Sequence, residues 1–115
     1  MITKDIGNIG EDLAKNYLED KGYILIERNY SWGLGEIDLI MLHDDIIVFV
    51  EVKLRKNDLY GRPRDFVTPN KQKKIMITAE NYILKNGLEN YQPRFDVVEI
   101  LMDNKYIEHI ENAFP

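Results

Sequence analysis

Two apolar runs rich in β-branched residues, separated by a short polar turn, constrain the fold of this chain most strongly. The first run covers residues 36–42 and the second covers residues 46–53. This pattern predicts an antiparallel hairpin. The second run is apolar at almost every position until its end, which is typical of a central strand covered on both faces. The hairpin therefore predicts a sheet with a layer of structure on each side.

The register of this hairpin brings charged side chains together at one end of the sheet. If the turn spans residues 43–46, the numbers of facing positions add up to 89. Asp38 then faces Glu51, and Glu36 faces Lys53. Like charges that face each other at about 5 Å between Cβ atoms destabilise a strand pair. A divalent cation would relieve the repulsion, because Mg²⁺ takes carboxylate oxygens. The alternative is a Glu36–Lys53 ion pair with the other two acids in solvent.

The same residues carry a resemblance to a nuclease superfamily. Asp38, followed by Glu51-Val52-Lys53 on the next predicted strand, resembles the D…(D/E)xK core of restriction-endonuclease-like proteins, the PD-(D/E)xK superfamily. Ile37 stands where the motif usually has proline. The blocks 35–40 and 48–53, with Gly10-Glu11 upstream and residues 67–72 downstream, resemble more narrowly the YraN family of bacterial proteins. This second resemblance covers nearly the whole chain.

The resemblance implies a divalent-metal-dependent endonuclease that hydrolyses DNA, with Mg²⁺ or Mn²⁺ as cofactor. Asp38, Glu51 and Lys53 would be its catalytic residues. The two acids would bind the metal, with the Val52 carbonyl and Glu11 as further ligands, and Lys53 would position the attacking water. Helical spacing alone places Glu11 at the border of a buried stripe and predicts a surface residue, so its role rests on the resemblance.

A basic segment directly follows the predicted catalytic strand. Between Lys53 and Lys74 the chain has eight basic and two acidic residues, whereas the rest has seven basic and eighteen acidic ones. Such a segment is well placed to hold a phosphate backbone. Charge runs more commonly only solvate a surface, which is the alternative. The residues predicted to bind DNA are Arg55, Lys56, Arg62, Arg64 and Lys71.

Apolar periodicity and turn signals predict the remaining elements. Residues 3–21 form a helix, residues 23–30, 94–101 and 106–110 form strands, and Thr68-Pro69 opens a helix that ends before Gly87. The resulting order αβββαββ predicts an α/β fold of the restriction-endonuclease-like sandwich type. Its mixed central sheet would have four to five strands, with a helix on each side.

Several side chains within these elements carry specific expectations. The first helix is expected to bury Ile6, Ile9, Leu13, Tyr17 and Leu18, and the second Ile75, Met76, Ala79, Tyr82 and Ile83. Gln72 lies on the second stripe and needs a partner, either the nearby backbone or the active-site end of the sheet. Glu36 and Gln72 would support the site.

Two connecting segments also carry expectations. Trp32 lies between the first two strands and is expected to cover the end of the sheet, although it could stack on a base. Residues 54–67 form a long loop, which we expect to be poorly ordered without substrate.

The composition excludes several classes of function. The chain has no cysteine, which excludes disulfides, thiolate nucleophiles and Cys-based zinc sites. His43, in the predicted turn, and His109, in the last strand, are predicted to be surface residues rather than ligands. No apolar run approaches the ~20 residues that span a bilayer, and the first residues do not resemble a secretory signal. We therefore expect a single cytoplasmic domain, residues 1–115, without membrane contact.

More than one function remains open on the sequence. The endonuclease could act on branched or structured DNA, as Holliday-junction resolvases do, and would then work as a homodimer. A catalytically inactive nucleic-acid-binding module on the same fold is the main alternative. A protein-interaction domain with a solvated carboxylate cluster is a third hypothesis. The net charge of −5 argues only against a nonspecific nucleic-acid coat over the whole surface.

Overall fold

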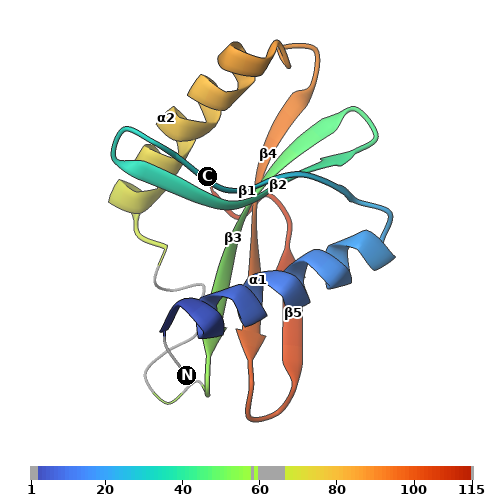
Figure 1. Cartoon of the computed structure of the whole chain (residues 1–115), viewed down its shortest axis with the longest axis vertical. Helices are drawn as coiled ribbons and strands as arrows, with labels where there is room; N and C mark the ends of the chain where they lie inside the picture. The colour runs from blue at the N-terminus through green and yellow to red at the C-terminus, as the bar shows by residue number, and fades with distance from the viewer. Residues whose placement is uncertain (1–2, 58, 60–66, 115) are drawn as a thin grey trace.

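The computed structural model of the chain describes residues 3–57, 59 and 67–114. These residues form two helices and a five-stranded mixed sheet in the order αβββαββ, which confirms the predicted α/β sandwich (Figure 1). None of the described helices is long and apolar enough to cross a membrane. The elements are α1 (Thr3–Asp20), β1 (Ile24–Trp32), β2 (Gly35–His43), β3 (Ile46–Arg55), α2 (Pro69–Asn86), β4 (Gln92–Leu101) and β5 (Tyr106–Ile110).

The strands lie side by side in the order in which they follow one another along the chain. All neighbours are antiparallel except β3 and β4, which are parallel. Parallel neighbours need a crossover connection, and α2 lies within it. Strand β3 continues to Arg55, which pairs with Leu101, so the strand runs further than the sequence predicts. The predicted disorder of the following loop concerns mainly residue 58 and residues 60–66, which lie outside the described residues.

Helix α1 packs on one face of the sheet through small residues. Gly10, Ala14 and Leu18 recur every four residues and are buried, whereas Ile9 is 39% exposed, so its predicted burial is wrong. The reason is the closeness of the helix to β3: a Cβ atom on Gly10 would lie 3.2 Å from Leu54 Cδ2. The helix turns its smallest residues towards the strand, which moves Ile9 to the rim.

Helix α2 packs on the opposite face and begins and ends as predicted. The Thr68 side chain accepts a hydrogen bond from the Lys71 amide, and Gly87 ends the helix with φ 64°. The buried side chains include Ile75, Ala79 and Tyr82, which join the core formed by Ile47 and Phe49. Met76 is instead 43% exposed, which contradicts the prediction. Thr78 is fully buried and points to the sheet, so the contact face is rotated away from Met76.

Strands β2 and β3 pair along only part of their length. Their ladder runs from His43–Ile46 to Leu39–Val50, which confirms the predicted register over these five pairs. The ladder stops one position before Asp38 and Glu51. The first half of β2 pairs with β1 instead, and the two strands diverge beyond the centre of the sheet (Figure 1). The predicted Glu36–Lys53 facing pair is therefore not part of the β2–β3 ladder.

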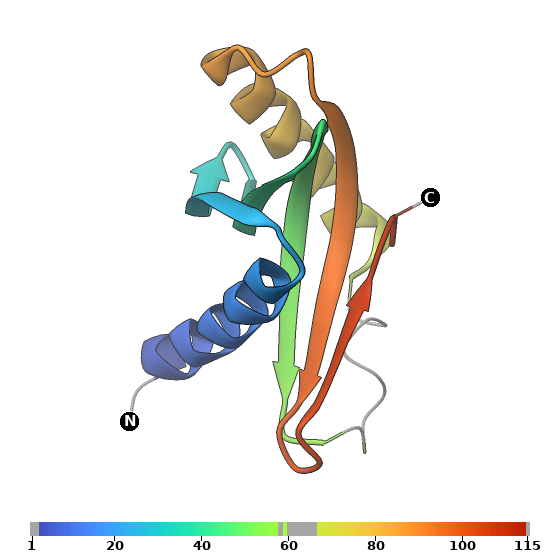
Figure 2. The same cartoon turned by 90° about the vertical axis from the view of Figure 1, so that its right-hand side faces the viewer.

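A bend in β1 accompanies this divergence. The β1–β2 ladder passes from Arg28–Leu39 to Tyr30–Ile37 and leaves out the intervening position, where Asn29 adopts a left-handed φ of 54°. A left-handed residue in a strand changes its direction, and asparagine accepts this conformation more readily than most residues. Figure 2, turned by 90°, shows the β1–β2 hairpin leaning away from the long strands β3 and β4.

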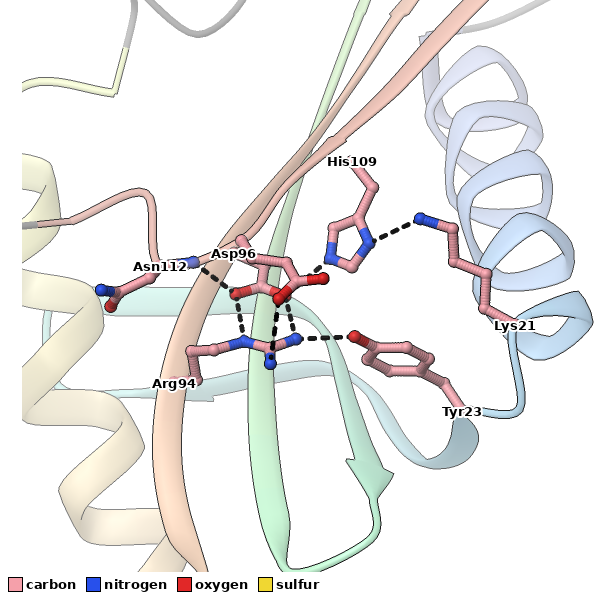
Figure 3. A network of polar contacts seen from close by, with 7 residues as sticks. Lys21, Tyr23, Arg94, Asp96, His109 and Asn112 are labelled. Atoms are coloured by element: carbon pink, nitrogen blue, oxygen red, sulfur yellow. Dashed lines mark hydrogen bonds and ion pairs between the residues drawn. The ribbon is translucent and has the colours of Figure 1, made fainter.

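A buried polar network ties β4 and β5 to the segment before β1. Arg94 donates two hydrogen bonds to Asp96, at 2.9 and 2.8 Å, and a third to the Tyr23 hydroxyl at 2.7 Å (Figure 3). The Asn112 amide donates to Asp96 at 3.0 Å. Asp96 is fully buried. The Asp96 side chain lies on the α1 face of the sheet, with Val98.

His109 belongs to the same network, and its predicted surface position is wrong. Its side chain is fully buried, its Nε2 lies 2.7 Å from Asp96 Oδ2, and its Nδ1 lies 3.1 Å from Lys21 Nζ (Figure 3). A lysine ammonium can only donate, so Nδ1 accepts and Nε2 carries the proton donated to Asp96. His43, at the end of β2, stacks on Tyr23 with ring centroids 4.1 Å apart.

Candidate active site

A pocket of about 380 Å³ lies where β2 and β3 diverge, on the sheet face that carries α2. Glu51 and Lys53 lie two and four positions after Phe49 on β3, so all three side chains leave the sheet on the same face. The Phe49 ring is part of the core on the α2 side, which places Glu51 and Lys53 on that side too. The divergence of the strands supplies the opening and α2 supplies the opposite wall. The lining residues are Leu34, Gly35, Glu36, Asp38, Glu51, Val52, Lys53, Lys71, Lys74 and Ile75.

The two predicted catalytic acids lie together in this pocket. Asp38 Oδ2 accepts a hydrogen bond of 2.8 Å from the Val52 amide, which attaches β2 to β3 just beyond the last ladder pair. Glu51 is only 7% exposed. Among the described residues, no donor reaches Glu51 Oε1, although this oxygen is buried. A buried carboxylate oxygen without a partner destabilises the fold, so Glu51 Oε1 lacks the hydrogen bond or cation that would stabilise it.

Burial holds the pKa of both acids high, and the charges of neighbouring acids add to this effect, from Glu11 and Glu36 on Asp38 and from Asp38 on Glu51. Burial raises the pKa of Asp38 to about 6, against the opposing effect of the Val52 amide. Burial, together with the charge of Asp38, raises the pKa of Glu51 to about 8. Two acids whose charges repel each other in a desolvated pocket are the arrangement that a bound cation stabilises.

Lys53 places an amine next to the acids. Its Nζ lies 3.9 Å from Glu51 Oε2, and its side chain is 15% exposed. Burial lowers the pKa of Lys53, while the charge of Glu51 opposes that effect and the neighbouring Lys71 adds to it. The predicted triad of Asp38, Glu51 and Lys53 is thus brought together in one pocket.

The first turns of α2 add two more cations to the pocket wall. Lys71 was predicted to bind DNA, and it is near enough to lower the pKa of Glu51. Lys74 also lines the pocket but was not singled out by the sequence. Its spacing of three residues from Lys71 puts both on one face of the helix, which is the signal that could have found it.

Two predicted supporting residues have partners that the sequence only partly anticipated. Glu36 lines the pocket and accepts a hydrogen bond of 3.1 Å from Ser31, across the β1–β2 hairpin. Gln72 donates to the Val67 carbonyl at 3.0 Å, so of the two predicted alternatives it takes the nearby backbone. Gln72 does not line the acidic pocket. It borders a different, mostly apolar hollow of about 510 Å³ between α2 and the start of β4.

Glu11 lies near the site but does not line the pocket. Its Oε1 accepts hydrogen bonds from Arg28 at 3.2 Å and from Asn29 at 3.1 Å. Its charge reaches Asp38, whose pKa it helps to raise. Because Asn29 lies at the bend opposite Asp38, these bonds place Glu11 just behind the point where the strands diverge.

The other predicted DNA-binding residues lie away from the pocket or outside the described part of the chain. Arg55 and Lys56 are exposed at the end of β3, where their carbonyls accept hydrogen bonds from the amides of Met102 and Asp103. Arg62 and Arg64 are not among the described residues. The basic character of the pocket itself therefore comes from Lys53, Lys71 and Lys74.

A further buried acid lies beside the site and was not predicted. Glu99 pairs with Lys53 in the parallel β3–β4 ladder and is fully buried. Residues paired in a ladder share a face of the sheet, so Glu99 is on the same side as Lys53. The β3–β4 register could not be read from the sequence, because these strands are separated by a helix rather than by a short turn.

The donor set of the pocket fits a hard divalent cation. It offers the paired carboxylates of Asp38 and Glu51, and the extended Val52 turns its carbonyl to the same side as the amide that bonds Asp38. Among the described residues, no group of three or more His, Cys, Asp or Glu side chains could hold a metal. Mg²⁺ is commonly held by one or two carboxylates, with water and substrate phosphate completing the shell. The buried Glu51 Oε1, which has no described hydrogen-bond partner, is the observation behind this fit.

The fold and the pocket together define an α/β sandwich protein with a half-buried acid, a buried acid and a lysine at the point where two central strands diverge. Comparison with protein families finds a match to the uncharacterised protein family UPF0102 over residues 10–100. That range contains every predicted catalytic and metal-binding residue. The chain belongs to this family, the YraN family of bacterial proteins.

Close relatives cover almost the whole chain. A UPF0102 protein of Clostridioides difficile is 47% identical over 114 residues, covering 99% of this chain and 100% of its own length. One of Clostridium tetani is 52% identical over 102 residues, covering 89% of this chain and 84% of its own. One of Alkaliphilus metalliredigens is 46% identical over 114 residues, covering 98% of this chain and all of its own length.

Proposed function

We propose that this protein is a divalent-metal-dependent endonuclease that hydrolyses DNA phosphodiester bonds. The observation that supports this most directly is the pairing of the half-buried Asp38 with the buried Glu51, which has an oxygen that no described residue satisfies, beside an amine in an open pocket. For stability alone this arrangement is unfavourable. It becomes favourable when a cation and a phosphate enter, which is the condition for hydrolysis of a phosphodiester.

Asp38 and Glu51 hold Mg²⁺ or Mn²⁺ in this proposal, with the Val52 carbonyl as a third oxygen. When bound, the cation supplies Lewis acidity towards the scissile phosphate and lowers the pKa of water. The Val52 amide fixes the Asp38 carboxylate and so keeps its second oxygen directed at the pocket. Glu11 does not contact the cation in this proposal, but its negative charge raises the pKa of Asp38.

Lys53 orients the attacking water and stabilises the charge that develops on the phosphate. Its Nζ lies 3.9 Å from Glu51 Oε2, at the edge of the acid pair, where it would contact a phosphate oxygen. Lys71 and Lys74 hold the neighbouring phosphates, and the start of α2 adds the partial positive charge of a helix N-terminus. Arg55 and Lys56, exposed at the end of β3, would contact phosphates further along the DNA, and Arg62 and Arg64 keep their predicted DNA-binding role as residues outside the described part of the chain.

A cleavage assay with matched variants tests the proposal. Wild-type protein is incubated with fluorescent DNA in Mn²⁺, Mg²⁺ or EDTA, beside Glu51→Gln, Asp38→Asn and the control Glu89→Gln, an exposed acid before β4. We expect cleavage in Mn²⁺ or Mg²⁺ by the wild type and by Glu89→Gln alone. Equal cleavage by Glu51→Gln would refute the assignment.

A catalytically inactive nucleic-acid-binding module is the second candidate. One observation favours it: among the described residues, no group of three or more His, Cys, Asp or Glu side chains is arranged to hold a metal ion. This module would bind DNA with Lys71 and Lys74 and would show no Mn²⁺ uptake. Calorimetric titration of the wild type with Mn²⁺ separates the two functions, because only the enzyme needs the ion.

Branched or structured DNA is the substrate class that we propose for this endonuclease. A resolvase-like enzyme for branched DNA has to cut two strands, so it would act as a homodimer in the cytoplasm. Sedimentation of the protein with and without a four-way DNA junction tests this, and a strictly monomeric complex would restrict the activity to single cuts.

A further inference from the structure

The turn between β1 and β2 presents two exposed apolar side chains, Leu34 at the acidic pocket and Trp32 at a second hollow against α2. Trp32, the last residue of β1, is 48% exposed, and Leu34, in the turn itself, is 87% exposed. The exposure of Trp32 contradicts the prediction that it covers the end of the sheet. Leu34 lines the acidic pocket, and Trp32 borders a hollow of about 200 Å³ on the outer side of α2. Large apolar side chains at the rim of a site commonly indicate a ligand surface.

This turn is held firmly against α2. The buried Thr78 hydroxyl lies 3.0 Å from the Trp32 carbonyl. Gly35 approaches the helix so closely that a Cβ atom there would lie 2.5 Å from the Lys74 carbonyl oxygen. Figure 1 shows the turn lying beside α2. The two apolar side chains are therefore presented from a fixed position, which lowers the entropy cost of binding to them.

The charges around the turn indicate what kind of ligand would occupy it. Lys71 and Lys74 line the same pocket as Leu34, so cations for phosphate and an apolar surface lie side by side. Ile77 and Leu84 extend the apolar surface beyond Trp32 along α2. A nucleotide carries a flat apolar base next to its phosphate, and single-stranded nucleic acid is bound by aromatic side chains combined with positive charge.

We propose that Trp32 and Leu34 form a base-binding tip that contacts the face of an unpaired or terminal nucleobase when its strand lies in the acidic pocket. The inference rests on the proposed function, because it takes a nucleic-acid phosphate as the ligand of that pocket. Inside a duplex both faces of a base are covered by its neighbours, so the tip can reach only a base that is unpaired, flipped or at an end. The substrate class is therefore DNA with a single-stranded or frayed region next to the cut.

The fluorescence of Trp32 provides a direct test, because it is the only tryptophan of the chain. The full-length protein with Glu51→Gln, in EDTA so that no strand is cut, is titrated with three DNA probes of equal phosphate number. These are a single strand, the same strand with abasic sites, and a blunt duplex closed by linkers. We expect strong quenching of Trp32 emission by the first probe only.

Affinity measurements on variants in the same background separate base contact from charge. Fluorescence anisotropy should show that Trp32→Ala weakens binding of the single strand about 5- to 100-fold, as expected for the loss of one stacked base. Binding of the abasic and duplex probes should change less than about twofold. Leu34→Ala, at an exposed turn position that packing does not need, should give a smaller loss on the single strand. Ile24→Ala, an exposed apolar residue at the other end of β1, is the control and should change nothing.

Several outcomes would overturn the inference. These are equal quenching by the abasic strand, an equal effect of Trp32→Ala on all three probes, or no binding of any probe. Cleavage by the wild type is measured separately and tests the proposed function. Cleavage without a base contact would end this inference alone, whereas a base contact without cleavage would end the proposed enzyme and leave the binding tip.

Discussion

The Asp38 carboxylate accepts a hydrogen bond of 2.8 Å from the Val52 amide, at the point where the ladder between their two strands has just ended. The backbone amide that would otherwise lose its partner is thus satisfied by a side chain. The bond holds Asp38 beside Glu51, whose buried Oε1 has no described partner. The same divergence that opens the pocket therefore also fixes the acid pair within it.

Removal of the Glu51 charge should stabilise the protein when no divalent cation is present. Burial and the charge of Asp38 raise the pKa of Glu51 from 4.5 to about 8. An acid whose pKa is higher in the folded state favours folding only while protonated, so stability falls as the pH rises from about 4.5 to about 8. Glu51→Gln should therefore be more stable than the wild type at pH 8, by about 1–3 kcal/mol, the usual cost of an unsatisfied buried polar group.

Urea denaturation at pH 5 and pH 8 in EDTA measures this difference. The free energy by which Glu51→Gln is more stable than the wild type should be smaller at pH 5, where the Glu51 carboxyl of the wild type is protonated. Glu89→Gln, on an exposed acid, should match the wild type at both pH values. A variant less stable than the wild type at pH 8 would show that the Glu51 charge is already satisfied.

Lys53→Met should separate ion binding from catalysis. The amine lies beside the acids but carries a positive charge, so its loss should leave Mn²⁺ binding intact or tighten it. Cleavage should fall about 100-fold or more, because the amine is the group that stabilises charge on the phosphate. Calorimetry and single-turnover cleavage check the two effects. Lys15→Met, on the exposed side of α1, should leave both unchanged, and full activity of Lys53→Met would remove the residue from the site.

Asp96→Asn should destabilise the fold without affecting the acidic pocket, which lies on the opposite face of the sheet. Burial alone would raise the pKa of Asp96, but hydrogen bonds from His109, Arg94 and the Asn112 amide lower it below its usual value. Removing one member of a buried ion pair costs about 3–5 kcal/mol.

The sign of the pH dependence provides a second check on this network. An acid with a lowered folded pKa stabilises the fold above its unfolded pKa, near 4, and this stability is lost as the pH falls further. The difference in free energy of unfolding between the wild type and Asp96→Asn, measured by urea denaturation, should therefore become smaller below about pH 4. Asp103→Asn, on an exposed acid of the β4–β5 turn, is the control. If this free-energy difference does not depend on pH, the variant has lost packing rather than the charge interactions of Asp96.

Gly35→Ala should displace the β1–β2 turn from α2. The new Cβ atom would lie 2.2 Å from Thr78 Oγ1 and 2.5 Å from the Lys74 carbonyl, and a helix backbone cannot retreat without repacking. The expected loss of stability is about 1–3 kcal/mol, the range for overpacked cores. Thermal denaturation measures it. Leu34→Ala, at the exposed neighbouring position, should stay within about 0.5 kcal/mol of the wild type, and equal effects of both changes would contradict the close approach.

Much of the fold could be predicted because it is encoded locally. The helix α2 begins at Thr68-Pro69 and ends before Gly87, since the two ends carry residues whose conformations suit a helix start and stop. The β2–β3 register follows from a short turn, which leaves little freedom in how the strands align. The three catalytic candidates were therefore identified from spacing together with the family resemblance.

The features that were missed depend on contacts between distant segments. The sequence did not predict that β2 leaves β3 at Asp38, where a bend of β1 at Asn29 accompanies the divergence. His109 was expected at the surface, since nothing local shows that Asp96 lies across the β4–β5 pair to receive it. The position of Glu99 beside Lys53 depends in the same way on a parallel register that no turn sets.

Calorimetric titration with Mn²⁺ shows whether Asp38 and Glu51 together bind a divalent cation. We expect saturable binding of one Mn²⁺ per chain by the wild type and by Glu89→Gln, and loss of that binding in Asp38→Asn and Glu51→Gln. Circular dichroism should show that all four proteins are folded. Absence of Mn²⁺ binding by the folded wild type, or equal binding by Asp38→Asn, would contradict the proposed cation binding.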